Sequence, residues 1–299
     1  MTAASPEGAA RDVAEAWLAA DPDEDVRVEL QALLDGPGEE LAARFAGRLT
    51  FGTAGLRAPV GAGPLRMNRL VVRQAAAGLA AYVAATARRA REPTSTLRVV
   101  VGYDARRKSD VFALDSARVI AAAGLRVILL PSALPTPVLA WTLLDLGAAA
   151  AVMVTASHNP SADNGYKVYL GDGAQIVSPH DVEIAARIAE VDPVAVPMAA
   201  EDDALIERAD ASVVERYVES MRTVRCRPDT PGVAVAYTPM HGVAGETLLR
   251  AFAVAGLPEP VVVESQFAPD PTFPSVAFPN PEEPGAMDRV IELAASSGG

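Results

Sequence analysis

The chain has 299 residues, half of them hydrophobic, and a formal net charge of −12 at pH 7. This length suits about two domains of ordinary size, and the composition excludes a disordered or fibrous protein. The negative charge argues against general binding to nucleic acid or to a membrane surface, so local basic residues must explain any affinity for an anionic substrate.

Several features of the sequence predict the cellular compartment of the protein. No uninterrupted apolar run approaches the roughly 18 residues that a membrane helix needs, and the start of the chain lacks the basic-then-apolar order of a secretory signal. The single cysteine, Cys226, cannot form an internal disulfide, which agrees with a reducing compartment. We therefore expect a soluble cytoplasmic protein with no membrane or nucleic-acid partner. The sequence leaves its oligomeric state open.

The first part of the chain predicts helices and then a loop. Residues 1–48 carry apolar side chains at helical spacing, for example in "RDVAEAWLAADP", and predict an N-terminal helical extension. Residues 49–68, "LTFGTAGLRAPVGAGPLRMN", are rich in glycine and punctuated by proline and arginine, which favours a loop. Loops of this kind often carry functional residues.

Helices and strands then alternate. An alanine-rich helix leads into the strand "LRVVVGYD", a helix over 109–123, the strand "LRVILLP", the helix "TPVLAWTLLDLG" and a strand that ends at Ser157. This order predicts an α/β fold with a mixed, mostly parallel sheet covered by helices. Functional residues of such sheets gather at the carboxyl ends of strands, and both Asp104 and Ser157 occupy such ends.

A polar, proline-bearing stretch around 190–204 predicts a domain boundary. We assign 49–203 to a first domain and 204–299 to a second. The second contains two predicted strands, in "GVAVAYT" and "PVVVES", and three predicted helices. So few elements make a thin core, which indicates an incomplete domain.

The stretch "VTASHNPSADNGYKVYL", from Val154 to Leu170, is the most informative. The apolar run before it reads as a buried strand, and Asn-Pro at 159–160 and Asp-Asn-Gly at 163–165 predict consecutive turns. Ser157 and His158 therefore stand on a polar turn at the mouth of a strand.

Two other kinds of site fit this serine poorly. A serine-hydrolase elbow needs Gly-x-Ser-x-Gly, which is absent around Ser157, although a triad with His180 or His241 stays open. The three histidines lack metal-ligand spacing, and the acidic clusters read as solvated turns or helix starts. Asp270, between two prolines, is not assigned to a cation.

Phosphoryl chemistry fits better. A phosphate on a strand-end serine needs neutralisation by backbone N–H groups, arginine, lysine or a divalent cation. Arg57 lies in the glycine-rich loop, where the arginine fork suits phosphate oxygens. Arg66 in that loop and Lys167 after the serine are further candidates. The basic run 106–108 reads equally well as a solvated helix start or as a substrate contact.

These motifs carry a resemblance to a known family. "TASHNPSADNGYKVY" resembles the phosphoserine loop of the α-D-phosphohexomutases, the phosphoglucomutase and phosphomannomutase superfamily, and "FGTAGLR" resembles its N-terminal active-site loop. "GYDARRKSD", "GDGAQIVSPHDVEI", "YTPMHGVAG" and "FPSVAFPNPEEPG" are similar to the branch with bacterial phosphoglucomutases and phosphopentomutase-like enzymes. The resemblance runs from about Leu49 onward and implies a first phosphohexomutase domain plus part of a second similar one.

The resemblance implies roles for particular residues. Ser157 would be the phosphorylated serine, and Mg²⁺ would bridge to its phosphate. His158 would contact substrate or phosphate, Lys167 would accept a proton or stabilise charge, and Arg57 would hold the phosphate. The predicted substrate contacts are Thr53, Asn159 and Arg106. A glucose 1,6-bisphosphate-type activator would prime the serine.

The chain departs from the family pattern in one respect. The metal loop Asp-x-Asp-x-Asp-Arg is absent, although in relatives it follows shortly after the region resembling "FPNPEEPG". Of the family's four domains, we expect the chain to supply the first and part of the second. We therefore expect a fragment with little or no mutase activity of its own, with exposed apolar surface.

The resemblance implies a phosphosugar mutase that moves a phosphoryl group between the C1 and C6 hydroxyls of a glucose or mannose phosphate, through a phosphoserine and a bisphosphate intermediate. One alternative keeps this chemistry with a pentose phosphate or with sugar-bisphosphate synthesis. The other is a non-catalytic fragment that binds phosphosugars.

Overall fold

The computed structural model describes residues 6–53, 55–91, 93, 96–227 and 229–297. The α-helices are α1 (Pro6–Ala20), α2 (Glu24–Asp35), α3 (Gly38–Phe45), α4 (Arg69–Ala90), α5 (Ser109–Ala122), α6 (Thr136–Asp145), α7 (His180–Ala189), α8 (Ser212–Ser220), α9 (Gly245–Val254) and α10 (Asp288–Ser296). The strands are β1 (Leu56–Pro59), β2 (Arg98–Tyr103), β3 (Arg126–Ala133), β4 (Ala150–Val154), β5 (Asp163–Leu170), β6 (Ile206–Arg208), β7 (Ala236–Tyr237) and β8 (Val261–Val262).

The main sheet has six strands in the order β1-β5-β4-β2-β3-β6. Strand β2 pairs in parallel with β3 and β4, and β3 pairs in parallel with β6, whereas β5 runs antiparallel to both β4 and β1. The predicted mixed, mostly parallel sheet is confirmed. Because β6 belongs to it, this sheet continues beyond residue 203, where the sequence predicted the second domain to begin.

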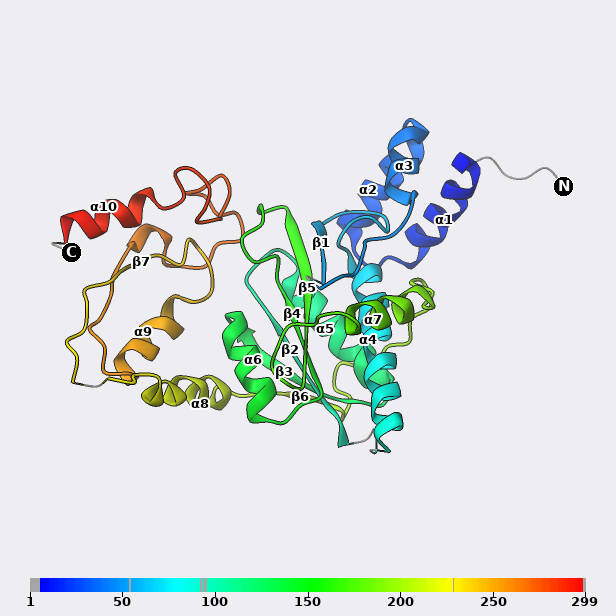
Figure 1. Ribbon diagram of the computed structural model, residues 1–299. Helices are drawn as coiled ribbons and strands as arrows, with labels where there is room; N and C mark the ends of the chain where they lie inside the picture. Colours follow the sequence, from blue (N-terminus) through cyan, green and yellow to red (C-terminus); the bar gives the residue numbers. More distant parts are fainter. Residues whose placement is uncertain (1–5, 54, 92, 94–95, 228, 298–299) are drawn as a thin grey trace.

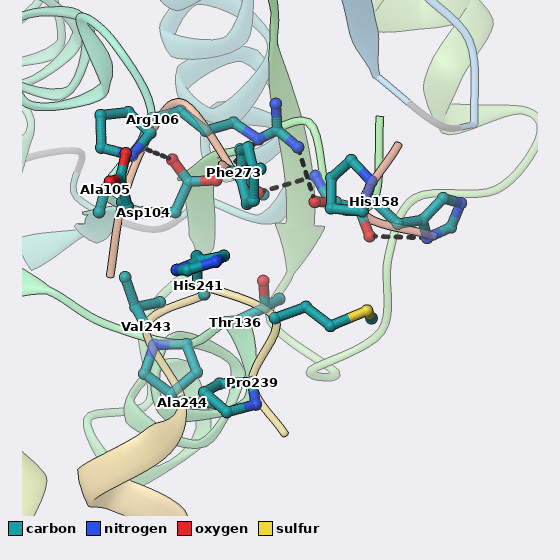
Figure 2. Close-up of a pocket in the computed structure, with 18 of the residues that line it drawn as sticks. Asp104, Ala105, Arg106, Thr136, His158, Pro239, His241, Val243, Ala244 and Phe273 are labelled. Carbon is teal, nitrogen blue, oxygen red and sulfur yellow. Dashed lines mark hydrogen bonds and ion pairs between the residues drawn. The ribbon is translucent and has the colours of Figure 1, made fainter. Parts of the chain in front are cut away.

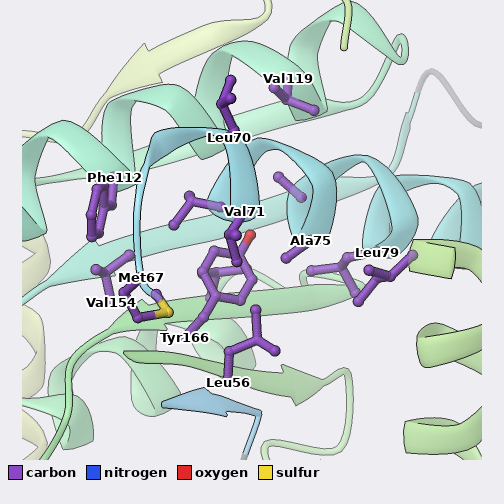
Figure 3. Packing of buried hydrophobic residues seen from close by; sticks show 14 of the residues in the cluster. Leu56, Met67, Leu70, Val71, Ala75, Leu79, Phe112, Val119, Val154 and Tyr166 are labelled. Atoms are coloured by element: carbon purple, nitrogen blue, oxygen red, sulfur yellow. The ribbon is translucent and has the colours of Figure 1, made fainter. Parts of the chain in front are cut away.

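Helices cover both faces of this sheet. Along β2, Val99 and Val101 join the core cluster that contains residues of α4, α5 and α7, whereas Val100 joins the cluster with α6 and α8. Successive side chains of a strand point to opposite faces, so an unbroken apolar strand can serve two cores. Figure 3 shows the first cluster, with Tyr166 of β5 packed beneath α4.

Helix α4 begins at a well-defined cap. The Asn68 side chain accepts from Val71 N at 3.0 Å and donates to the carbonyl oxygens of Gly61 and Gly63, at 3.0 and 2.8 Å. One buried amide thus starts the helix and holds the preceding glycine-rich loop.

Among the described residues, α4 has the length and mean hydropathy of a membrane span, although it contains no uninterrupted apolar run of that length. The apolar window is 72% buried inside the protein. It therefore packs as the central helix of a core.

The N-terminal helices are tied to this core by ion pairs. Lys108 Nζ lies 2.7 Å from Asp23 Oδ2 and 2.6 Å from Asp25 Oδ1. Arg69 bonds both Asp23 and the fully buried Asp115, which also accepts from Arg73. A buried carboxylate needs such partners, so this network links α2, α4 and α5.

The second unit is built from α8, α9, α10 and a two-stranded parallel sheet of β7 and β8. The predicted strands in "GVAVAYT" and "PVVVES" shrink to two residues each. Each has only one neighbour to bond, and an isolated pair of strands is marginal. Figure 1 shows this unit on one side of the main sheet and α1–α3 on the other.

Candidate active site

A cleft of about 350 Å³ opens where β2 and β4 end, between the main sheet and the second unit. The first wall comes from the main sheet and carries Asp104, Arg106, Thr155, Ser157 and His158. The second wall comes from the second unit and carries Pro239, Met240, His241, Asp270 and Phe273. Figure 2 shows Arg106 and Asp104 on one side and His241 facing them. Asp104 and Ser157, both predicted at the carboxyl ends of strands, line the same cleft.

Ser157 stands exposed on the turn after β4. Its backbone adopts a left-handed conformation, φ 56°, and its N–H donates to Thr155 Oγ1 at 2.9 Å. This bend turns the chain sharply and presents the hydroxyl to the cleft, where Ser157 Oγ lies 3.4 Å from His158 Nδ1. Left-handed backbone in a non-glycine residue is uncommon and is concentrated at functional sites.

The histidines proposed for a triad are engaged elsewhere. His180 Nδ1 lies 2.7 Å from Tyr82 Oη, and His180 lines a different pocket. His241 does line the cleft, but its Nε2 lies 2.8 Å from Ser275 Oγ. A triad orients the histidine toward the nucleophile, and these contacts do not.

Arg106 is buried, with 4% of its surface exposed, and holds the serine turn from within. Its Nη1 donates to the carbonyl oxygens of Pro160 and Asp163 at 2.7 and 3.1 Å. Its Nη2 donates to those of Ser157 and Asn159 at 3.0 and 2.6 Å. Burial lowers the pKa of Arg106 and Asp104 opposes this, yet an arginine stays charged in proteins. Neither sequence reading, solvated helix start or substrate contact, anticipated this clamp.

Arg57 contacts the turn, and Lys167 is coupled electrostatically to Arg57, although neither residue is part of the cleft lining. Arg57, on β1, donates from Nη1 to Asn159 Oδ1 at 2.9 Å. Lys167 lies on β5, the strand that pairs with both β1 and β4. Burial lowers the pKa of Lys167, the positive charge of Arg57 lowers it further, and Asp104 acts in the opposite direction. A lowered pKa leaves more of a lysine neutral at a given pH, which makes it a better proton acceptor.

The turn predicted at Asp163–Gly165 is wrong, because these residues begin β5. They pair with β1, and a side chain at Gly165 would place its Cβ 2.6 Å from Thr155 O and 2.8 Å from Leu56 O. Two neighbouring strands satisfy this backbone and override the local turn preference. Glycine is needed here for close approach between strands, not for a turn.

Sequence reasoning missed Asn164. This side chain is fully buried and donates to Arg107 O and Ser109 Oγ, both at 3.0 Å. It therefore joins β5 to the segment that carries Asp104 and Arg106. An asparagine next to a glycine signals a turn, and nothing local distinguishes this tertiary role.

Of the predicted site residues, Ser157, His158 and Arg106 line the cleft, whereas Arg57, Asn159 and Lys167 do not. The remaining predicted residues also lie outside the cleft lining. Thr53 is exposed, and its carbonyl oxygen accepts from Gln175 Nε2 at 2.7 Å. Arg66 donates to the neighbouring Leu65 O. Lys108 and Arg107 pair with acidic residues of the N-terminal helices.

The Mg²⁺ that the resemblance implies would need carboxylate ligands in the cleft. Asp104 and Asp270 lie on opposite walls, and each already accepts hydrogen bonds from its own segment. Among the residues that the structure describes, no three His, Cys, Asp or Glu side chains gather as a metal site. These residues do not fit the ion by themselves.

Comparison with known proteins decides the family. Models of domains I and II of phosphoglucomutase/phosphomannomutase, both described as alpha/beta/alpha, match residues 48–195 and 215–299. The chain belongs to this family. A probable phosphomannomutase of Haemophilus influenzae is 47% identical over 76% of this chain and 46% of its own length.

Other relatives bear different names. A probable phosphoribomutase of Schizosaccharomyces pombe is 36% identical over 96% of this chain and 50% of its own length. Human glucose 1,6-bisphosphate synthase is 36% identical over 93% and 46%. A solved family protein from Burkholderia thailandensis, 24% identical, shares the fold with a TM-score of 0.64 over 83% of this chain and 50% of its own. The chain thus spans about half the length of these relatives.

Proposed function

We propose that this chain carries the phosphoryl-accepting half of a phosphosugar mutase, with Ser157 as the residue that is phosphorylated. The observation that carries the proposal is the exposed Ser157 hydroxyl, on a turn that Arg106 clamps and that Arg57 contacts through Asn159. Lys167 interacts electrostatically with Arg57 and with Asp104 of the cleft. Phosphoryl transfer depends on positioning and charge neutralisation more than on an activated nucleophile. A serine held beside cations therefore suffices.

The proposed transfer of a phosphoryl group uses Ser157, Lys167 and Arg57 of this chain. Ser157 Oγ forms a bond to phosphorus while the bond from phosphorus to the sugar oxygen breaks. The hydroxyl proton passes to Lys167 Nζ when that amine is neutral, and the released sugar oxygen takes up a proton from solvent. Arg57 offsets the charge of the phosphoryl oxygens. The reverse transfer, to the other hydroxyl, completes the exchange.

The leading substrate is a glucose or mannose phosphate, with exchange between the C1 and C6 hydroxyls. The relatives are named as mutases of mannose, ribose and pentose phosphates and as a bisphosphate synthase. Pentose exchange and bisphosphate synthesis are therefore the alternatives within this chemistry. A phosphosugar-binding chain without catalysis is the alternative outside it. We propose that the reaction takes place in the cytoplasm, as the sequence predicted.

The decisive experiment measures phosphate on Ser157 and does not need full turnover. The 299-residue chain is exposed to glucose 1,6-bisphosphate, or to ribose 1,5-bisphosphate, and its intact mass is followed with time. We expect one phosphoryl group that peptide mapping assigns to Ser157, absent from Ser157→Ala, and faster from the hexose donor. Faster transfer from the pentose donor would favour the pentose alternative. No phosphate from either donor would overturn the proposal.

A further inference from the structure

One contact joins the two walls of the cleft. The guanidinium carbon of Arg106 lies 4.9 Å from the centre of the Phe273 ring, which comes from the second unit. Figure 2 shows the ring beside the arginine side chain. A cation over an aromatic face within about 6 Å is attracted by the ring, and more strongly when both are desolvated. Here both residues are buried, at 4% and 8% exposure.

Arg106 has little freedom to do anything other than hold the serine turn. Its two terminal nitrogens bond four carbonyl oxygens between Ser157 and Asp163. The turn is therefore wrapped around the guanidinium, and its shape follows the position of that group. A shift of the guanidinium displaces the Ser157 hydroxyl, because Ser157 O is one of the four acceptors.

Phe273 is itself held in place by the second unit. Its backbone is left-handed, φ 49°, and its N–H donates to Asp270 O at 3.2 Å. Asp270 N donates to His241 O at 3.0 Å, and His241 N donates to Gln266 O at 2.8 Å. Gln266 is 1% exposed. A chain of bonds thus leads from the buried part of the second unit to the ring that meets Arg106.

We propose that Phe273 is a positioning residue for Ser157, through which the seating of the second unit sets the geometry of the phosphoserine turn. The ring limits the movement of the Arg106 guanidinium, and the guanidinium sets the four carbonyl groups of the turn. The consequence for rate rests on the proposed function, whereas the consequence for the mobility of the turn does not.

The first test compares three variants in the full chain. Phe273→Leu removes the aromatic face, Phe273→Tyr retains it, and Phe267→Leu makes the same change in the second unit outside the cleft lining. We expect phosphorylation of Ser157 by glucose 1,6-bisphosphate to slow about ten-fold in Phe273→Leu and to stay within about two-fold of the parent in the others. Equal rates in Phe273→Leu and Phe267→Leu would overturn the proposal.

The second test uses hydrogen exchange and separates the two proposals. Amides of 157–163 are expected to exchange about ten-fold faster in Phe273→Leu, and also in Arg106→Lys, which keeps the charge but loses the fork of donors. Exchange in β2 and β4 should not change. Should Phe273→Leu fail to fold, Phe273→Met takes its place. Unchanged hydrogen exchange at 157–163 would contradict this inference. Faster exchange in the turn, without any phosphorylation of Ser157, would contradict only the proposed function.

Discussion

The two walls of the cleft differ in what they supply. The first wall presents Ser157 with Arg106, Arg57 contacts the serine turn through Asn159, and Lys167 interacts electrostatically with Arg57 and Asp104. The second wall is mostly apolar, and its backbone is left-handed at Met240, His241 and Phe273. Under the proposed function, the positive charge for phosphoryl transfer therefore comes from the main sheet, and the second unit contributes shape.

The walls also differ in what lies beneath them. Behind the first, β2 and β4 sit between two core clusters, and α4 and α5 are joined through the buried Asp115. Behind the second, β7 and β8 pair over only two residues. A site that must hold a reacting group steady benefits from rigid elements, so the chemistry lies on the better supported side.

The largest expected effect contrasts one residue beside the turn with one from the second wall. Lys167→Ala should slow phosphorylation of Ser157 by glucose 1,6-bisphosphate about 100-fold or more, because it removes both a proton acceptor and a cation. Met240→Leu, which preserves an apolar side chain, should stay within about three-fold. Time-resolved intact mass measures both. Comparable losses of phosphorylation rate in the two variants would contradict the assignment of charge to the main sheet and of shape to the second unit.

A second prediction concerns the support of the first wall. Gly165→Ala should lower the free energy of unfolding by about 2–4 kcal/mol, because the added Cβ meets backbone oxygens of both neighbouring strands. Gly47→Ala, where a Cβ meets nothing within 4 Å, should change it by less than about 1 kcal/mol. Urea unfolding of both variants checks this. A tolerated alanine at 165 would mean that the strands around the serine turn are not tightly fixed.

The smallest expected effect is a shift in pH dependence. If neutral Lys167 accepts the proton, phosphorylation of Ser157 rises with pH through the pKa of Lys167. Arg57→Gln removes a charge that lowers this pKa, so the rise should move to higher pH. Asp104→Asn removes a charge that raises it, so the rise should move to lower pH. The phosphorylation rate is measured against pH for the parent and the two variants. Shifts of the same sign in both variants would exclude Lys167 as the proton acceptor.

Much of the fold followed from local pattern. The alternating helices and strands and the position of Ser157 at the end of β4 could be predicted, because apolar periodicity and turn residues act over a few positions. The start of β5 could not, since Asp163–Gly165 has the local chemistry of a turn and becomes strand only between β1 and β4. The prediction of longer strands in the second unit failed for the converse reason. The residues around β7 and β8 have an apolar pattern, but these two strands pair only with each other in the described structure.

The sequence by itself determined which chemistry-bearing residues the chain has and that Ser157 would stand on a polar turn after a buried strand, although β4 ends at Val154 and not at Ser157. Only the tertiary structure decided that Arg106 turns inward to bind carbonyl oxygens 51 to 57 positions away and that Phe273 covers it. Periodicity and turn preference are short-range properties of the chain. The role of a long charged side chain depends on which distant segments pack around it. A buried charge is costly unless hydrogen-bond or ionic partners surround it, and those partners come from the distant segments.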